Sequence, residues 1–546
     1  MSELVTAAQM RAIEQAAISS GKVTGLALME RAGQGVVQAI CETWPELTIG
    51  AHGAVVLCGP GNNGGDGYVV ARLLAARGWS VAVFAYGDPA RLPPDARANY
   101  ERWCRVGGCA PLTALDDSTF SDAAVTVDAL FGTGLTRPLP SEVLNALMFA
   151  STRPNAAAPQ RPPIVAVDIA SGVDADSGRV IGGDEQGDEL PYWPALTVTF
   201  GAAKVGHMLL PHAGDTRHKL VVAPIGVEDD IARAYLTWNV VEHLDLAAVR
   251  HIDLLGRPDI SLQALELAKD VASHKFGHGH AVILSGPAGR TGAARLAARA
   301  ALRVGAGLVT VAAPRDAMAE NAAQLTAIML REAEGAAALA DLLRDKRLNA
   351  ICLGPGLGQA RARDLVPVAL DATRDRDVSG VVLDADALSA FADDPVDLFT
   401  MLHDGCVLTP HAGEFARLFP DLSARLNAPA MTGPAYSKVD AARDAAERAG
   451  CTVLLKGSDT VIADETGDAA INAACYDRAA PWLATAGSGD VLAGLVTGLL
   501  ARGYAPVTAA ETAAWLHTEA ALSFGPGLIA EDLPEELPKV FRALGV

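Results

Sequence analysis

Two glycine-rich turns, each leading into a helix-like run, constrain the fold of this chain more than any other feature. The first is Gly59-Pro60-Gly61-Asn62-Asn63-Gly64-Gly65-Asp66-Gly67, and the second is Ala484-Thr485-Ala486-Gly487-Ser488-Gly489-Asp490. Glycine lets the backbone approach a phosphate closely, and the start of a helix offers unpaired N–H groups to an anion. Two such turns of different design predict two sites for phosphorylated ligands on one polypeptide.

Apolar, strand-like runs alternate with helix-like segments throughout the chain. In the first half these runs are Ala54–Cys58, Ser80–Ala85, Ala124–Asp128, Ile164–Ile169, Leu196–Phe200 and Leu220–Ala223. In the second half they are Ala281–Leu284, Leu308–Ala312, Ala350–Leu353, Val381–Asp384, Val407–Thr409 and Thr452–Leu455. This alternation is typical of parallel sheets covered by helices on both faces. Because 546 residues exceed one ordinary core, we predict an α/β chain with two three-layer domains, residues 1–235 and 236–546.

Charge and cysteine content narrow the possible partners and the compartment. The net charge is -20 and no segment concentrates Lys and Arg, which argues against nucleic-acid binding because that requires a cationic surface. The sequence shows no signal peptide and no apolar run long enough to span a membrane. Its eight cysteines form no CxxC pair, as expected in a reducing cytoplasm. We therefore expect a cytoplasmic protein with neither a nucleic acid nor a membrane as partner.

The first turn matches the G-x-G-x-x-G pattern of dinucleotide-binding proteins at Gly59, Gly61 and Gly64. Asp88 lies downstream at a distance suited to holding a ribose. The pattern by itself fits a tight structural turn equally well. No residues for a hydride-accepting substrate accompany it, so a nicotinamide-dependent dehydrogenase is a remote alternative.

Oxygen-bearing side chains follow other strands of the first half. Asp128 and Asp168 each end a strand beside a glycine turn. Asn63, Asp128 and Ser171 offer oxygen ligands, which suit a hard cation such as K⁺, Na⁺ or Mg²⁺ rather than zinc. Asp168 is then the candidate for acid–base chemistry. Lys204 follows a later strand, where either a phosphate contact or a solvated surface position is possible.

The first half resembles NAD(P)H-hydrate epimerase from about Thr6 to Val227. The resemblance is carried by the GNNGGDG turn, by Asp128–Gly134 and by Asp168–Asp174, in which Ala170 replaces the usual proline. It implies a Rossmann-like domain that interconverts the R and S forms of hydrated NAD(P)H, with Asp168 as the acid–base group and K⁺ held by Asn63, Asp128 and Ser171. The substrate contacts that it implies are Asn62, Asn63, Gly64, Gly65, Asp66, Gly132, Thr133, Gly134, Leu135, Thr136, Arg137, Pro138 and Asp168.

The second turn, Gly487–Asp490, precedes an apolar helix-like run. Backbone N–H groups at a helix start can hold a phosphate, and a carboxylate beside them can move a proton during phosphoryl transfer. The same residues could also form an ordinary helix cap. Three nearby histidines, His274, His278 and His280, lack carboxylates at metal-binding spacing and are better interpreted as a polar loop.

The second half, from about residue 250 to 546, resembles the ADP/ATP-dependent NAD(P)H-hydrate dehydratase, which has a ribokinase-like fold. The motifs that carry this resemblance are Gly354–Gly358, Leu383–Leu388, Thr409–Glu414, Lys456–Thr460 and Gly487–Asp490. It implies dehydration of the S form with ADP and Mg²⁺, giving AMP and phosphate, with Asp490 taking the hydroxyl proton. The substrate contacts that it implies are Ala293, Gly356, Gly358, His411 and Asp490. The nucleotide contacts are Lys456, Gly457, Ser458, Asp459, Thr460, Gly487, Ser488 and Gly489.

Both resemblances together predict a bifunctional enzyme whose small-molecule partners are hydrated NAD(P)H and ADP, and which forms a homo-oligomer. Two other interpretations stay open. One is a vitamin or sugar kinase fused to a nucleotide-binding sensor domain, since G-x-G-D turns serve many kinases. The other is an interaction module in the first half, although such a module has no need for Asp168.

Overall fold

The computed structural model describes residues 4–152, 161–183, 190, 192–210, 218–237, 252–255, 267–269, 274–374 and 380–546. The chain divides into two compact units. The first contains residues up to Val249 together with Ala428–Ser437, and the second contains Arg250–Asn427 and Lys438–Val546. The predicted boundary between residues 235 and 236 lies within helix α7 (Glu228–Thr237) and stays a prediction.

The first unit is built on a seven-stranded sheet with the order β3-β2-β1-β4-β5-β6-β7, in which every neighbouring pair is parallel. Its strands are β1 (Gly53–Cys58), β2 (Ser80–Ala85), β3 (Cys109–Pro111), β4 (Ala123–Ala129), β5 (Ile164–Val167), β6 (Leu196–Phe200) and β7 (Lys219–Ala223). The strand order turns back between β1 and β4, and parallel sheets bind ligands beyond the carboxyl ends of the strands at such a switch point. The predicted α/β fold class and the Rossmann-like strand order are confirmed.

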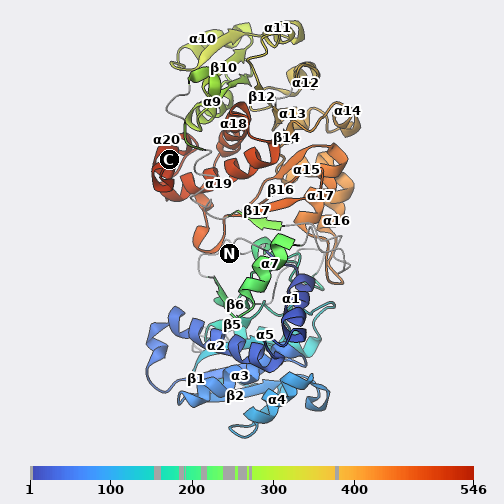
Figure 1. Ribbon diagram of the computed structural model, residues 1–546, viewed down its shortest axis with the longest axis vertical. Helices are drawn as coiled ribbons and strands as arrows, with labels where there is room; N and C mark the ends of the chain where they lie inside the picture. The colour runs from blue at the N-terminus through green and yellow to red at the C-terminus, as the bar shows by residue number, and fades with distance from the viewer. Residues whose placement is uncertain are drawn as a thin grey trace. The chain divides into compact units, whose positions relative to one another are not determined.

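Helices cover this sheet, as Figure 1 shows for α2, α3 and α4 around the blue strands β1 and β2. Their apolar faces and the strands form one continuous core, in which Val36, Val56 and Leu74 are fully buried. The helices are α1 (Ala7–Ser19), α2 (Gly25–Thr43), α3 (Asn62–Ala76), α4 (Pro94–Trp103), α5 (Ser141–Ser151), α6 (Val205–Leu209) and α7.

Helix α3 begins at Asn62, within the glycine turn that was expected to precede the helix, so most of this turn is helical. Close packing explains the glycines. A Cβ on Gly64 would lie 2.0 Å from the Gly59 carbonyl oxygen, and a Cβ on Gly65 would lie 2.6 Å from the Met29 sulfur. These glycines therefore let α3 start directly against the end of β1 and against α2.

The second unit has a ten-stranded sheet with the order β11-β10-β9-β12-β13-β14-β15-β16-β17-β8. Strands β9 to β15 all run parallel to one another. Strand β16 is antiparallel to both of its neighbours, β15 and β17. The strands are β8 (Ile252–Leu254), β9 (His280–Leu284), β10 (Leu308–Ala313), β11 (Met329–Glu332), β12 (Ala350–Leu353), β13 (Gly380–Leu383), β14 (Cys406–Leu408), β15 (Thr452–Leu455), β16 (Asp459–Ala463) and β17 (Ala469–Ala473).

Helix α18 (Ser488–Ala501) lies at the centre of this unit, because every residue from Val491 to Ala501 is buried. Small residues let it pack tightly, since a Cβ on Gly494 would lie 2.2 Å from the Ala297 carbonyl oxygen of α9. The other helices are α9 (Gly292–Arg303), α10 (Met318–Ala322), α11 (Ala336–Leu342), α12 (Gln359–Thr373), α13 (Asp386–Ser389), α14 (Pro395–Phe399), α15 (Ala412–Leu418), α16 (Pro420–Asn427), α17 (Lys438–Ala449), α19 (Pro506–Phe524) and α20 (Asp532–Leu544).

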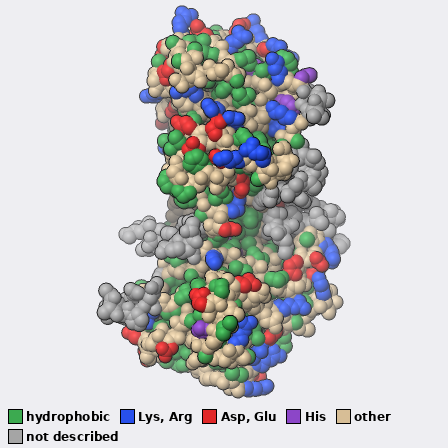
Figure 2. Space-filling view, turned by 90° about the vertical axis from the view of Figure 1, so that its left-hand side faces the viewer, with side chains coloured by type: hydrophobic (Ala, Val, Ile, Leu, Met, Phe, Trp, Pro, Cys, Tyr) green, Lys and Arg blue, Asp and Glu red, His purple; other side chains and the backbone are tan. Residues whose placement is uncertain are grey.

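Two surface properties bear on the choice of partners. Among the described residues, none of the helices has the length and apolar character needed to cross a bilayer. On the face shown in Figure 2, Lys and Arg side chains are interspersed with Asp and Glu rather than gathered in one patch. That face gives no basis for nucleic-acid binding, which requires concentrated positive charge.

Candidate active sites

A cavity of about 450 Å³ lies at the carboxyl edge of the first sheet. It is bounded by the turn after β1, by the loop after β4 and by Asp168 after β5, and α1 and α2 complete its wall. The polar or charged lining residues are Arg11, Glu14, Asn62, Asn63, Asp66, Asp95, Thr133, Asp168 and Lys204. The cavity therefore lies at the switch point of the sheet and carries several carboxyl groups.

Asp168 is held in an unusual conformation at this cavity. Its φ of 68° lies in the left-handed region, which costs a non-glycine residue free energy and is common at functional sites. Its Oδ1 accepts hydrogen bonds of 2.9 Å from both Lys204 Nζ and Thr199 Oγ1, and its carbonyl oxygen lies 2.9 Å from His207 Nε2. The two hydrogen bonds to Oδ1 therefore hold the Asp168 side chain in place, and Asp168 lines the cavity.

Of the two positions considered for Lys204 from the sequence, the solvated surface position is wrong, because its side chain is only 2% exposed. Its ammonium group donates to Asp168 Oδ1 at 2.9 Å, to Thr199 Oγ1 at 2.8 Å and to the Phe200 carbonyl at 3.2 Å. Lys204 also lines the cavity, and the phosphate contact stays a prediction. Burial is the largest single influence and would raise the pKa of Asp168, but the charge and hydrogen bond of Lys204, together with His207 and the Thr199 hydrogen bond, outweigh it, so the pKa lies below its usual value. Asp168 is thus prepared as a carboxylate.

Of the predicted potassium ligands, Asn63 lines the cavity, whereas Asp128 and Ser171 are hydrogen-bonded to each other outside its lining. Ser171 Oγ donates to Asp128 Oδ1 at 2.7 Å, and the Ser171 backbone N–H donates to Oδ2 at 3.0 Å. The Asn63 side chain lies beside the next loop, since a Cβ on Gly132 would be 3.2 Å from its Oδ1. Asp128 is fully buried, and its hydrogen-bond donors are two backbone amides and the hydroxyls of Ser171 and Tyr192.

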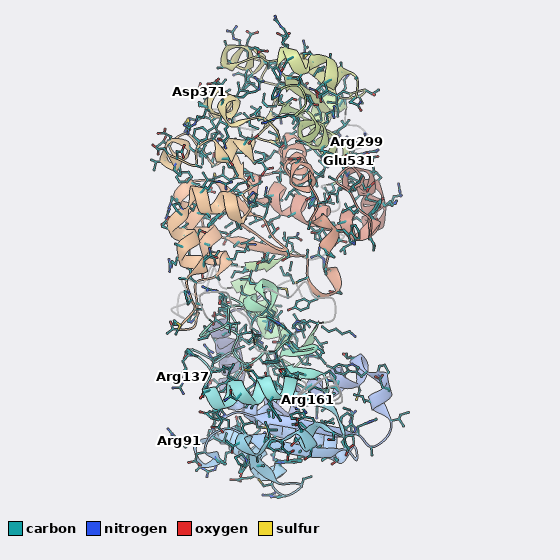
Figure 3. The ribbon with its side chains drawn as sticks, turned by 180° about the vertical axis from the view of Figure 1, so that it is seen from behind. Arg91, Arg137, Arg161, Arg299, Asp371 and Glu531 are labelled. Atoms are coloured by element: carbon teal, nitrogen blue, oxygen red, sulfur yellow. The ribbon has the colours of Figure 1, made fainter. Side chains whose placement is uncertain are left out.

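The structure separates the other predicted substrate contacts of the first unit into three groups. Asn62, Asn63, Asp66 and Gly132–Leu135 line the cavity. Gly64 and Gly65 are buried in the packing of α3. Thr136, Arg137 and Pro138 are exposed and lie outside the cavity lining, and Figure 3 shows Arg137 on the loop before α5. These roles stay predictions.

Helix α1 contributes cavity residues that the sequence interpretation missed. Met10, Arg11, Glu14 and Ile18 all line the cavity, and their spacing of about one turn places them on one face of the helix. Their helical spacing could have identified the shared face, but only the folded chain shows that this face meets Asp168.

The second site is formed where β12, β13, β14 and β15 end side by side. Asp384 follows β13 and is 2% exposed, and its Oδ1 accepts a 2.6 Å hydrogen bond from Lys456 Nζ, which follows β15. Glu414 Oε2 lies 3.9 Å from the same ammonium. Burial works against the Lys456 charge, but both carboxylates favour it, and its pKa is raised overall. The predicted nucleotide ligand Lys456 is therefore already bound to two acidic side chains.

Asp490 belongs to the first turn of α18, beside this ion pair. Burial, reinforced by the negative charge of Asp384, raises its pKa to about 6 despite the opposing effect of Lys456. A carboxyl group that titrates near neutral pH is suited to accept a proton during a reaction and to release it afterwards. The acid–base role of Asp490 stays a prediction, with which this pKa is compatible.

The turn before α18 has the backbone conformation of an anion site. Gly487 has a φ of 90° and caps the helix without a side chain. A Cβ there would lie 2.8 Å from Leu296 Cδ1 and 3.0 Å from Ala530 Cβ. Ser488 Oγ donates to the Leu483 carbonyl oxygen at 2.8 Å, so that side chain shapes the turn. The Ser488 amide donates to the Thr485 carbonyl oxygen at 3.4 Å. Among the described residues, the Gly489 and Asp490 amides have no such acceptor and can bind a ligand.

The remaining predicted contacts occupy the neighbouring loops. Gly356 and Ala293 lie together, because a Cβ on Gly356 would be 3.4 Å from Ala293 Cβ. The Gly358 amide donates to Asp386 Oδ2 at 2.8 Å. His411 caps α15, and its Nδ1 accepts the Gly413 amide at 2.9 Å.

The predicted nucleotide loop is the hairpin between β15 and β16. Thr460 Oγ1 donates to the Gly457 carbonyl oxygen at 2.8 Å, which closes the turn. Asp459 accepts a 2.6 Å hydrogen bond from Lys438 Nζ. Ser458 lies within the turn, and its carbonyl oxygen accepts the Ala474 amide at 2.7 Å. Lys456–Thr460 therefore lie at this loop, whereas the other predicted nucleotide contacts, Gly487, Ser488 and Gly489, lie at the start of α18.

Comparisons with known proteins agree with this two-site arrangement. Residues 281–539 match the family model described as NAD(P)H-hydrate dehydratase, and residues 25–206 match the model described as YjeF-related protein N-terminus. A bifunctional NAD(P)H-hydrate repair enzyme from Moorella thermoacetica is 36% identical over 99% of this chain and 97% of its own length. The chain belongs to the family of bifunctional NAD(P)H-hydrate repair enzymes.

Each half also has relatives of its own. An NAD(P)H-hydrate epimerase from Rhodobacter capsulatus is 47% identical over 42% of this chain and 100% of its own length. A crystal structure of the ADP/ATP-dependent NAD(P)H-hydrate dehydratase from Bacillus subtilis, co-crystallized with ATP and Mg²⁺, is 27% identical, covers 51% of this chain and 94% of its own, and has a TM-score of 0.41. Members of this repair family are enzymes, and the chain is one of them.

Proposed function

We propose that this chain restores hydrated NADH and NADPH in two steps, epimerising the R and S hydrates in the first unit and dehydrating the S hydrate in the second. The observation that carries the proposal is the match to a bifunctional repair enzyme over nearly the whole length of the chain. In addition, each candidate site contains a largely buried carboxyl group beside a lysine. Epimerisation supplies the S form that the second reaction consumes.

In the first unit, the Asp168 carboxylate exchanges a proton with the hydroxyl group or the incoming water at C6 of the nicotinamide ring. Lys204 keeps this carboxylate charged and fixes its orientation through Oδ1. The glycine start of α3 and the Gly132–Leu135 loop hold the dinucleotide phosphates and ribose, because exposed amides at a helix start attract anions.

Potassium fits the polar group formed by Asn63, Asp128 and Ser171. Asp128 is a buried carboxylate, and none of its hydrogen-bond donors among the described residues carries a positive charge. A monovalent cation would compensate that charge, and Asn63, Asp128 and Ser171 provide the hard oxygen ligands that K⁺ prefers. When bound, the ion would stabilise the two loops that border the cavity.

In the second unit, Asp490 removes the proton from the C6 hydroxyl of the S hydrate as this oxygen attacks the terminal phosphoryl group of ADP. The amides of Gly487, Ser488 and Gly489 stabilise the negative charge on the transferred phosphoryl group. Phosphate then leaves C6 and a proton leaves C5, which restores the double bond and gives NAD(P)H, AMP and phosphate. Phosphorylation thus replaces a poor leaving group by a good one.

The nucleotide is held by the hairpin from Lys456 to Thr460, and Mg²⁺ would bind with its phosphates, as usual for this ion. ADP is the proposed donor, and ATP is the alternative that the same site could accept. A cytoplasmic location and a homo-oligomeric state belong to the proposal as well. All eight cysteines are unpaired, which agrees with a reducing compartment.

The test uses purified protein with separated R and S hydrates of NADH, Mg²⁺, K⁺ and either ADP or ATP. We expect the dihydronicotinamide absorbance to return from both epimers, and AMP to appear in proportion when ADP is the donor. Without nucleotide, we expect interconversion of the epimers and no NADH. A phosphorylated vitamin or sugar as the product, with no response to the hydrates, would instead support the kinase alternative.

A further inference from the structure

Epimerisation at C6 needs proton transfer on both faces of the nicotinamide ring, whereas Asp168 can serve one face only. The hydroxyl group leaves from one face and water returns to the other. A single carboxyl group fixed by Lys204 and Thr199 cannot move between these two faces. This inference rests on the proposed epimerase function. It requires a second titratable group in the cavity, on the other face of the ring.

Helix α1 brings such a group to the cavity. Met10, Arg11, Glu14 and Ile18 form the cavity-facing side of the helix. The residues just before α1 are attached to the segment after β6, because Val5 forms a parallel bridge with Lys204 and the Val5 amide donates to the Ala203 carbonyl oxygen at 3.2 Å. The position of Glu14 is therefore set relative to the Asp168–Lys204 pair.

Glu14 has no structural role that would explain a carboxyl group at this position. Among the described residues it makes neither a hydrogen bond nor an ion pair, whereas Gln9 and Gln15 of the same helix are both hydrogen-bonded. It faces the same cavity as Asp168 and Lys204, and it comes from a helix rather than from the sheet edge. A planar ring bound between α1 and that edge would have the two carboxyl groups on opposite faces.

The electrostatic environment shifts the pKa values of Glu14 and Asp168 in opposite directions. Burial and the negative charge of Asp168 raise the pKa of Glu14. The positive charges of Lys204 and Arg11 lower it by less, so the pKa is raised overall. Lys204 lowers the pKa of Asp168. Two neighbouring carboxyl groups with opposite shifts are typical of an acid and a base that act together.

We propose that Glu14 is a second catalytic acid–base residue of the first site and acts on the ring face opposite Asp168. For one epimer, the Glu14 carboxyl donates its proton to the C6 hydroxyl. The C6–O bond breaks, water leaves, and the lone pair of the ring nitrogen forms an iminium ion. Water then adds to C6 from the other face and gives its proton to Asp168. The other epimer reacts by the reverse sequence, and no oxidant or reductant is needed.

The test replaces Glu14 by Gln and follows each pure epimer in water enriched in ¹⁸O, without nucleotide. The wild-type enzyme should interconvert the epimers and incorporate ¹⁸O into both. In Glu14→Gln, interconversion should fall by a factor of about 10² to 10⁴, the usual contribution of one acid–base group. Exchange of ¹⁸O should survive in one epimer only, because the Asp168 face remains functional, and Asp168→Asn should retain exchange in the opposite epimer.

Matched variants separate chemistry from structure. The double variant Glu14→Gln/Gln15→Glu preserves the charge of the helix but places the carboxyl on its exposed side, and it should remain as slow as the single variant. Circular dichroism and the thermal unfolding midpoint should be unchanged in both. Asp66→Asn and Asp95→Asn test the two other cavity carboxyl groups that make no hydrogen bond or ion pair among the described residues, and each should affect binding of the dinucleotide rather than one face of the ring.

Three results would overturn this assignment. They are wild-type interconversion in Glu14→Gln, equal loss of ¹⁸O exchange from both epimers in that variant, and one-sided exchange in Asp66→Asn in its place. If the wild-type enzyme itself fails to interconvert the epimers, the proposed function fails, and this outcome is distinct from the others.

Discussion

Lys204 Nζ lies 2.9 Å from Asp168 Oδ1, and the lysine side chain is almost completely buried. The pair joins β5 and the segment after β6 at the edge of the cavity, and it determines the charge of the proposed acid–base group. Replacing Lys204 by Met removes the ammonium that opposes the burial of Asp168.

For Lys204→Met we therefore expect epimerisation to fall by a factor of about 10² or more at pH 7. The pKa of Asp168 should rise, since burial is then opposed only by the smaller effects of His207 and the Thr199 hydrogen bond, and the remaining rate should increase with pH over a range where the wild-type rate is constant. A pH profile of epimerisation measures this. Lys219→Met, an exposed change on β7, should keep the wild-type profile.

Asp490→Asn should abolish dehydration and leave epimerisation intact. An amide has the shape of the carboxyl group but cannot take the hydroxyl proton, so NADH should not return when ADP and Mg²⁺ are supplied. Chiral chromatography of the hydrates should show equilibration of the R and S forms at the wild-type rate. Asp477→Asn, an exposed aspartate of the same unit, is the matched control, and recovery of NADH by Asp490→Asn would refute the assigned proton transfer.

The dehydration rate should decrease as the pH falls through about 6. Asp490 has a pKa of about 6, and the base is active only when ionised, so activity is present above this pH and lost below it. Between pH 7 and pH 5, kcat/KM should fall about ten-fold. Stopped measurements of AMP formation on the S hydrate test this, with the spontaneous change of the hydrate subtracted at each pH. A rate that rises on acidification would contradict the role.

Gly487→Ala should abolish dehydration by distorting the anion site. At its φ of 90° an L-residue is strained by about 1–2 kcal/mol, and the new Cβ would also lie 2.8 Å from Leu296 Cδ1. Gly503→Ala is the matched control, because Gly503 has a φ of 93° but no atom within 4 Å of the added Cβ. Both variants should lower the unfolding midpoint, but only Gly487→Ala should lose activity.

Removing potassium should slow epimerisation. With K⁺ replaced by tetramethylammonium at constant ionic strength, the buried Asp128 carboxylate loses the proposed counter-ion, and the loops at Ser171 and Gly132 lose a common anchor. Titration with K⁺ should restore the rate in a saturable manner. Asp128→Asn should be slow and insensitive to K⁺, and an enzyme equally active without K⁺ would remove the ion from the proposal.

The strands and the two glycine turns could be predicted because they depend on local patterns. Apolar runs such as Ala54–Cys58 and Leu196–Phe200 coincide with β1 and β6 almost residue for residue. The strand-end positions of Asp128 and Asp384 followed from the same pattern. Strands β3, β8, β11, β16 and β17 were not predicted. The first three have only three or four residues each, too few for a recognisable apolar run. Strands β16 and β17 form an antiparallel pair, which departs from the alternation of strands and helices used for the prediction.

The contacts that define the first site could not be predicted in the same way. The Asp168–Lys204 pair joins residues that are far apart in sequence, and a buried lysine has no local signature that separates it from an exposed one. The early start of α3 was missed because glycines normally weaken helices, whereas here packing against Met29 and Gly59 requires them. No role was predicted for helix α1, because its proposed role depends on the position of Glu14 in the same cavity as Asp168, which only the fold shows.

The first compact unit takes Ala428–Ser437 from the later part of the chain. Within that unit, the Gly433 amide donates to the Thr136 carbonyl oxygen at 3.2 Å, and Ala430 packs with Leu135 and Ile181. Proteolysis or gene division at a single peptide bond near Val249 would therefore not release two intact pieces. A divided form of this chain would have to keep Ala428–Ser437 together with the residues up to Val249, because Ala430 packs with Leu135 inside the first unit.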